Sequence, residues 1–161
     1  MDSSDVIAVC AAFIALSATG VSIWQGYLNR VHFRLSVRPH VTVHWNNTSD
    51  GRSIFTMFNN GLGPAIIRSF SIEINGQEIK DSGSGIIYEA LKSLGVGALE
   101  CKSFVPSEGE AYAVNSQLVL MDLYDLGEKH EKVKAALALM KFKIAYTSIY
   151  NENNFLYRGN C

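Results

Sequence analysis

The stretch ALSATGVSIWQGYLN, residues 15–29, overlaps a run of 23 residues without a formal charge, Val6 to Leu28. An α-helix rises about 1.5 Å per residue, so a helix over this run is about 34 Å long, and the hydrocarbon core of a bilayer is about 30 Å thick. The run therefore predicts one membrane-spanning helix. Its amino-terminal flank is acidic, with Asp2 and Asp5, whereas a cleaved signal peptide begins with positive charge. We therefore expect a retained span.

The charges that flank this run predict its orientation. Arg30, Arg34 and Arg38 follow it, whereas the other flank carries only acidic residues. Basic flanks stay on the cytoplasmic side of a membrane, and aromatic residues such as Trp24 and Tyr27 favour the headgroup level. We therefore expect the amino terminus outside and the rest of the chain in the cytoplasm.

Small or polar residues recur along the run at alternating steps of three and four, which keep a line of residues on one helix face. This polar seam consists of Ala8, Ala11, Ala15, Ala18, Ser22, Gln25 and Asn29. In lipid, helices associate through small residues and interhelical hydrogen bonds, and a lone helix would expose Gln25 to hydrocarbon. We therefore expect a homo-oligomer. The seam either packs the helices together or lines a water-filled pore when the bundle loosens.

From Leu35 onward the hydrophobic period changes from about 3.5 to 2, which is typical of strands with one buried face. Seven or eight short strands between turn signals predict an antiparallel β-sandwich or barrel-like domain with two short helices. The expected strands lie near 35–45, 53–58, 66–74, 101–105, 111–114, 116–124, 141–150 and 155–158, and the helices near 86–94 and 128–139. The predicted organisation is therefore a transmembrane helix with a juxtamembrane segment, residues 1–34, and a mainly β domain, residues 35–161.

The chain lacks the residue patterns of an enzyme. His40 and His44 share a strand face but have no evident third metal ligand, so solvated histidines are the simpler interpretation. The loop NNGLGPA, residues 59–65, is rich in glycine but lacks the lysine and following helix of a phosphate loop. We therefore expect no catalytic residues, no metal and no cofactor.

Charge is distributed unevenly along the chain, although its net value is −1. Residues 30–72 carry five arginines and one aspartate, whereas residues 73–140 carry eleven acidic residues and six lysines. Anionic lipid headgroups account best for Arg30 and Arg34. For the later arginines, an anionic ligand and lipid are equally good explanations.

Amides in the glycine-rich loop and the last strand pair supply further candidates for ligand binding. Aromatic rings beside cations can stack nucleotide bases, although an ordinary core with tyrosine hydroxyls at its rim explains the same pattern. The candidate ligand-binding residues are Arg38, Arg52, Asn59, Asn60, Arg68, Tyr146, Tyr150 and Arg158.

Three segments behind the amino-terminal span, RLSVRPHVTV (34–43), FNNGLGPAIIRSF (58–70) and IAYTSIYNENNF (144–155), resemble small bacterial single-span proteins with a cytosolic β-sandwich. This group includes the membrane effector of the Hailong anti-phage defence system. The resemblance implies a homo-oligomeric ion channel, for instance a tetramer, in the bacterial inner membrane. It also implies gating by a nucleotide or single-stranded DNA oligomer bound to the cytosolic domain, and a partner nucleotidyltransferase that makes this oligomer.

Two other functions fit the same residues. The first is a membrane-anchored protein-interaction module without channel activity, in which the helix is only a tether. The second is an envelope sensor, which needs the opposite orientation and is disfavoured by the arginines that follow the span. Replacing the span with an unrelated apolar helix separates a tether from a channel.

Overall fold

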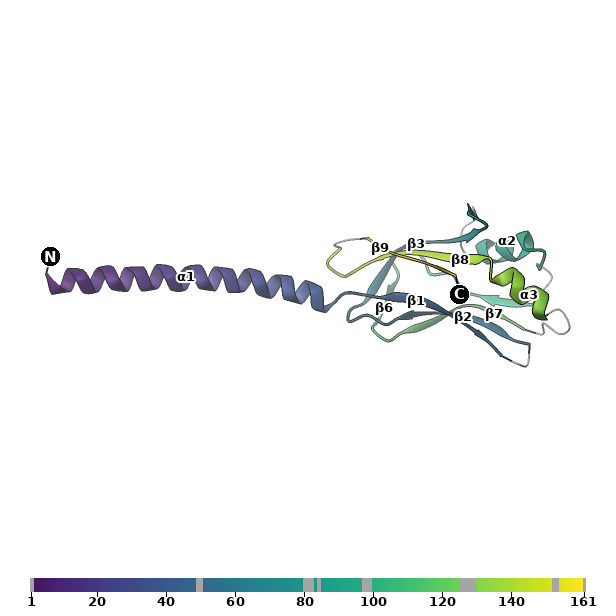
Figure 1. Ribbon diagram of the computed structural model, residues 1–161, viewed down its shortest axis with the longest axis horizontal. Coiled ribbons are helices and arrows are strands. Elements are labelled where there is room, and N and C mark those ends of the chain that lie inside the picture. The colour runs from purple at the N-terminus through teal and green to yellow at the C-terminus, as the bar shows by residue number, and fades with distance from the viewer. Residues whose placement is uncertain are drawn as a thin grey trace. The chain divides into compact units, whose positions relative to one another are not determined.

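The computed structural model describes residues 2–48, 51–79, 83, 85–96, 100–124, 130–151 and 154–160. The chain divides into two compact units, residues 1–36 and 37–161. The first unit is one helix, and the second is a domain of antiparallel sheets with two short helices (Figure 1). A long apolar helix followed by antiparallel sheets was the organisation expected from the sequence, and the structure confirms it at this level.

Helix α1 (Ser3–Ser36) contains the whole uncharged run. At its start the Asp5 carboxylate accepts a hydrogen bond from the Asp2 backbone N–H at 3.2 Å, as in a capping box, and its charge suits the positive end of the helix dipole. None of the helix residues is buried within the chain. By length and composition, α1 is sufficient to cross a membrane.

The helix ends later, and the first strand starts later, than the sequence pattern predicted. The strand expected from Leu35 begins only at Val41, because helical hydrogen bonding continues to Ser36. Pro39 then prevents further helix, since proline lacks a backbone N–H and disfavours the helical conformation of the residue before it. The two units accordingly divide between residues 36 and 37, two residues beyond the expected position.

Two antiparallel sheets make up the second unit. Sheet A has the strand order β1-β2-β7-β5, and sheet B has the order β4-β3-β8-β9 with β6 paired to β3. The strands are β1 (Val41–Asn47), β2 (Ser53–Asn59), β3 (Ala65–Ile74), β4 (Gln77–Glu78), β5 (Cys101–Ser103), β6 (Ala111–Tyr112), β7 (Gln117–Leu123), β8 (Met140–Thr147) and β9 (Phe155–Asn160). The short helices are α2 (Gly85–Ser93) and α3 (His130–Leu137). The start of the second helix expected from the sequence, residues 128–129, lies outside the described residues.

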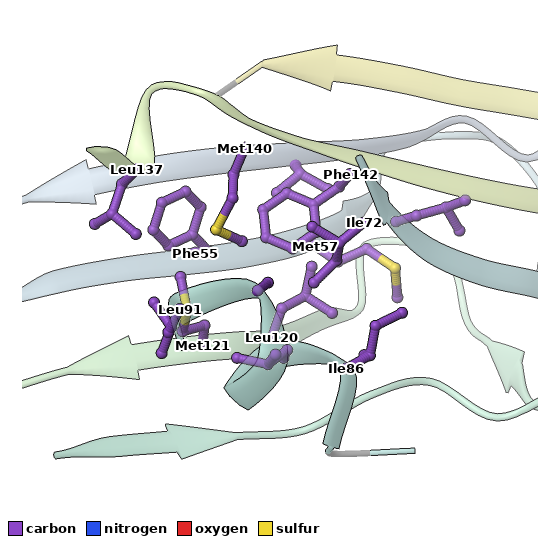
Figure 2. Close-up of a cluster of buried hydrophobic side chains, with 14 of the residues drawn as sticks. Phe55, Met57, Ile72, Ile86, Leu91, Leu120, Met121, Leu137, Met140 and Phe142 are labelled. Carbon is purple, nitrogen blue, oxygen red and sulfur yellow. The ribbon is translucent and has the colours of Figure 1, made fainter. Parts of the chain in front are cut away.

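The core lies between the two sheets and is closed by the short helices (Figure 2). Alternate residues of β2 and β8 point inward, and the rings of Phe55 and Phe142 meet with their centroids 5.5 Å apart. Helix α2 contributes Ile86, Ile87 and Leu91, which are almost fully buried. Burial of each such side chain stabilises the fold by roughly 1.5–3 kcal/mol. The period-2 pattern thus produces a sandwich because both sheets direct their apolar faces to one core.

Two tyrosine hydroxyls of sheet B bond to the backbone of edge strand β1. The Tyr146 hydroxyl accepts a hydrogen bond from the Val41 backbone N–H at 3.2 Å, and the Tyr157 hydroxyl donates one to the Val43 carbonyl at 3.3 Å. An open strand edge is a template for pairing with another chain. The tyrosines therefore protect this edge and fasten the two sheets together.

A hairpin at Asn75-Gly76, a residue pair that is a strong hairpin signal in the sequence, connects β3 to β4. Both residues have positive φ, 51° and 83°, which is the backbone conformation that a type I′ turn requires. Asparagine and glycine tolerate it better than other residues. The local sequence therefore determines this turn.

Candidate functional site

Helix α1 places all residues of the polar seam on one continuous helix. The hydroxyls next to and within the seam bond to the helix backbone: Thr19 donates to the Ala15 carbonyl and Ser22 to the Ala18 carbonyl, both at 2.8 Å. These hydroxyls need no partner from another helix, because their hydrogen bonds are made locally. Along the described helix, the polar side chains of the seam without such a local hydrogen bond are therefore those at its carboxyl-terminal end, Gln25 and Asn29.

The carboxamides of Gln25 and Asn29 differ from these hydroxyls. Within the described part of the chain, neither side chain has a hydrogen-bond partner, and both are exposed. A carboxamide offers two donors and an acceptor with two lone pairs. The helix thus carries two exposed carboxamides, without a partner in the described chain, on the face whose other members are small.

Two of the predicted ligand-binding arginines are engaged in ion pairs within the domain. The Arg52 guanidinium donates from Nε and Nη2 to the two Asp122 carboxylate oxygens at 2.8 and 2.6 Å. Arg158 Nη2 lies 2.8 Å from both carboxylate oxygens of Glu73. The hydrogen bonds from the arginines lower the pKa of each carboxyl group and outweigh the opposing effect of desolvation. Both guanidiniums therefore have structural partners.

The predicted aromatic platform on the last strand pair is divided between the core and the surface. Tyr146 is only 5% exposed and stacks on Phe155 inside the sandwich, with ring centroids 5.5 Å apart. Tyr150 lies in the loop after β8 and is exposed. Arg68 is hydrogen-bonded to the Asn151 side chain. These side chains do not form one continuous surface for stacking.

Asn59, at the end of β2, is almost fully buried at 1% exposure. Its side-chain oxygen accepts hydrogen bonds from the backbone N–H groups of His40 at 3.2 Å and Gly61 at 3.1 Å. Its amide nitrogen lies 2.9–3.2 Å from the backbone carbonyls of Gly63, Tyr112 and Ala113. Asn59 therefore fixes the glycine-rich loop to two neighbouring segments.

Glycine is required in this loop because backbone approaches backbone closely. A Cβ atom added at Gly63 would lie 2.0 Å from the Val37 carbonyl oxygen, and one at Gly61 would lie 2.3 Å from the His40 backbone nitrogen. Both positions are therefore restricted to glycine. The loop rests on residues 37–40, which lead into β1.

An open groove of about 650 Å³ lies on the outer face of sheet A. Strand register sets its geometry: Thr42 lies beside Phe58 and Phe58 beside Gln117, while His44 lies beside Thr56 and Thr56 beside Val119. The groove is lined by His44, Asn46, Ile54, Thr56, Phe58, Asn60, Gln117 and Val119. It combines an apolar floor with three carboxamides, and no acidic, lysine or arginine side chain is among these described lining residues.

The groove contains an aromatic pair held by hydrogen bonds at its rim. The rings of His44 and Phe58 pack edge to face with centroids 5.1 Å apart. The Asn60 amide donates to the Thr42 hydroxyl at 3.0 Å, and His44 Nε2 lies 3.3 Å from the same hydroxyl. Carboxamides that both donate and accept, placed beside aromatic rings, suit a flat group with polar edges, such as a nucleobase.

Arg38 lies in the segment that leads into β1. Arg38 and His40, directly before β1, are exposed, whereas Pro39 and Val41 are buried. Of the four predicted arginines, Arg38 alone has no side-chain partner in the part of the chain that the structure describes. Of the predicted ligand residues, Asn60 lines the groove, and Arg38 lies outside its lining, next to the glycine-rich loop.

The sequence analysis missed His44 as a binding residue and did not consider Phe58, Gln117 or Val119. A usable signal was present in β2, where Ile54 and Phe58 are apolar although they alternate with the core residues Phe55 and Met57. Apolar residues on both faces of a strand indicate an outer face with a use beyond solvation. No local pattern, however, indicates which β7 residues lie beside them.

The described residues contain no group of three or more histidine, cysteine or acidic side chains able to hold a metal ion. Burial raises the pKa of the Cys101 thiol to about 11, which disfavours the reactive thiolate.

No protein-family model, no curated protein and no solved structure matches this chain. The fold, the polar seam of α1 and the groove on sheet A define the class of this protein only as a β-sandwich domain that follows a long apolar helix.

Proposed function

We propose that this protein is a homo-oligomeric, single-pass membrane effector that forms an ion channel or pore. Its sandwich domain binds a nucleotide or single-stranded nucleic-acid oligomer that gates the pore. The observation that carries this proposal is the pair of carboxamides at Gln25 and Asn29, which have no partner within the described helix. The resemblance to Hailong-type effectors of bacterial anti-phage defence supplies the biological setting.

The argument for an oligomer follows from the lipid environment. An unsatisfied polar group in hydrocarbon costs several kcal/mol, so polar side chains face other helices or water. Alanines at positions 11, 15 and 18 allow close approach of equivalent helices along the same face. Gln25 and Asn29 then bond between subunits in a closed bundle, or face water in an open one.

The ligand would lie across the outer face of sheet A. In this proposal the bases lie in the groove against Phe58 and the carboxamides. A phosphate meets the exposed guanidinium of Arg38, in the segment before β1. Binding of a single-stranded oligomer weakens with salt, with a slope of about −0.7 per phosphate neutralised. Arg38→Ala should therefore weaken binding of a labelled single-stranded DNA oligomer and flatten its salt dependence. Binding that is indifferent to salt and to Arg38→Ala would remove nucleic acid as the ligand.

The channel is tested by replacing Gln25 with leucine. An apolar side chain at a constriction promotes dewetting, so Gln25→Leu should assemble normally but carry no current in planar bilayers. Thr19→Leu is the matched control, because the Thr19 hydroxyl already bonds within its own helix. Gln25→Leu oligomers that conduct like wild type would show that Gln25 only joins the helices.

A membrane-anchored interaction module is the alternative, and the absence of cationic side chains among the described lining residues of the groove favours it. Such a groove suits an uncharged segment of a partner protein as well as a base. Exchange of α1 for an unrelated apolar helix separates the two functions. A tether keeps its activity after the exchange, whereas a channel loses it.

A further inference from the structure

Loops of the sandwich expose large apolar side chains that no described part of the chain covers. Leu62, in the glycine-rich loop, is 72% exposed, and Ile149 and Tyr150, in the loop after β8, are 50% and 46% exposed. Single exposed apolar residues are common on proteins, but clusters of them mark interaction surfaces. Whether Leu62, Ile149 and Tyr150 are single exposed residues or form a cluster depends on where they lie in the domain.

All three residues lie at the end of the sandwich where β1 begins. The Leu62 backbone N–H donates to the Arg38 carbonyl at 2.9 Å, directly before β1. The loop after β8 lies at the same end, because Thr147 pairs with Ile66 at the start of β3. Figure 1 shows the start of β1 and the end of β8 at one end of the two sheets. We name Leu62, Ile149 and Tyr150 the loop cluster.

The chain from α1 enters the domain at this end, since residues 37–40 lead directly into β1. Arg38 and Arg68 lie beside the loop cluster, the first next to Leu62 and the second bonded to Asn151. The turn that holds Glu108 and Glu110 bonds through its backbone to Ile67, next to Arg68, and in the sequence Glu152 directly follows Asn151. The Glu110 carboxylate is occupied by the Ser107 backbone N–H and the Tyr112 hydroxyl. The cluster thus combines apolar tips with basic neighbours.

We propose that the loop cluster docks on an anionic bilayer surface. Leu62, Ile149 and Tyr150 enter the headgroup region, and Arg68 meets lipid phosphates. Tyrosine favours the headgroup level, and basic residues near a membrane surface each contribute about 1 kcal/mol of attraction. This inference rests on the membrane-spanning role proposed for α1, but not on channel activity or on the ligand.

The length of the connection permits this contact. The uncharged run ends at Leu28, and the remaining eight helical residues to Ser36 extend about 12 Å. The headgroup region of one leaflet is about 5–8 Å thick. The helical connection between the uncharged run and the domain is thus only a few ångströms longer than the headgroup region is thick.

The test uses the full-length protein in nanodiscs, with its three native cysteines replaced by alanine. An environment-sensitive fluorophore is attached to one introduced cysteine, Leu62→Cys or Tyr150→Cys. Leu139→Cys is the matched control. Leu139 is also exposed, but it lies directly before the first residue of β8, whereas the loop cluster lies at the end where β8 finishes. The discs contain either zwitterionic lipid alone or about one third phosphatidylglycerol. Lipid-borne doxyl groups and aqueous acrylamide serve as quenchers.

Docking predicts that doxyl lipid quenches the probes at 62 and 150, more strongly in the anionic discs, while acrylamide quenches the probe at 139. Acrylamide quenching at 62 and 150 equal to that at 139 would overturn the proposal. Protection from both quenchers would also overturn it, because another protein copy would then cover the cluster. A probe at Leu16→Cys reports on the span separately. If acrylamide reached that probe, the proposed membrane span itself would be wrong.

Discussion

Replacing Asn59 with alanine tests whether one buried side chain organises the glycine-rich loop. Asn59→Ala removes the acceptor of two backbone N–H groups and the donor to a set of backbone carbonyls. A buried donor left without a partner costs about 1–3 kcal/mol. Because both hydrogen bonds are only partly buried, the lower value applies to each, and the lost packing adds about 1 kcal/mol. The expected loss of unfolding free energy is therefore about 3 kcal/mol.

For a domain of this size, about 3 kcal/mol lowers the melting temperature by about 10 °C. Thermal unfolding of the full chain in detergent, followed by near-ultraviolet circular dichroism, measures this shift, and Trp45 stacked on Phe55 provides a core signal. Asn60→Ala is the matched control, since the exposed Asn60 makes one side-chain bond, to Thr42, and should change stability by less than about 0.5 kcal/mol. Equal melting temperatures for the two variants would refute the structural role assigned to Asn59.

Three further outcomes are expected. The Asp122 and Glu73 carboxylates have a lowered pKa in the folded protein, so they stabilise the fold above their ordinary pKa of about 4, and this stabilisation disappears as pH falls through the folded pKa values. In urea unfolding below about pH 4, the Asp122→Asn variant should therefore lose less stability than wild type. An equal loss of stability would remove Asp122 as a cause of the pH dependence. Tyr146→Phe leaves the Val41 N–H without its acceptor and should lower the free energy of unfolding, measured by chemical denaturation, by about 1–2 kcal/mol. Tyr150→Phe, at an exposed position, should leave this free energy almost unchanged. Similar losses for both variants would contradict the role of Tyr146 at the strand edge. A reporter fused to the carboxyl terminus should be active only in the cytoplasm, because three arginines follow the span, and periplasmic activity would reverse the proposed orientation.

Features determined by short stretches of sequence could be predicted, because the relevant interactions lie within a few residues. The uncharged run specifies a helix, and Asn75-Gly76 specifies a hairpin through their tolerance of positive φ. The end of α1 was placed too early, since Leu35 belongs both to the helix and to a period-2 pattern. Only Pro39, further on, stops the helix.

The partners of the candidate site residues could not be predicted, because they are distant in sequence. Arg52 looks available for an anion, but its partner Asp122 lies 70 residues away. Asn59 looks like a loop amide, yet it meets carbonyls more than 50 residues further along the chain. The groove likewise depends on the register between β2 and β7, which places Gln117 beside Phe58. Register of this kind is set by the packing of the whole domain.

Cysteine cross-linking along α1 in membranes tests the central claim most directly. In a variant with the three native cysteines replaced by alanine, single cysteines are placed from position 8 to position 29, and disulfide-linked dimers are measured after mild oxidation. The account predicts maxima at Ala11, Ala15, Ala18 and Ser22, and minima at Phe13 and Leu16 on the opposite face. Uniformly low cross-linking, or maxima at Phe13 and Leu16, would contradict a homo-oligomer assembled through the polar seam.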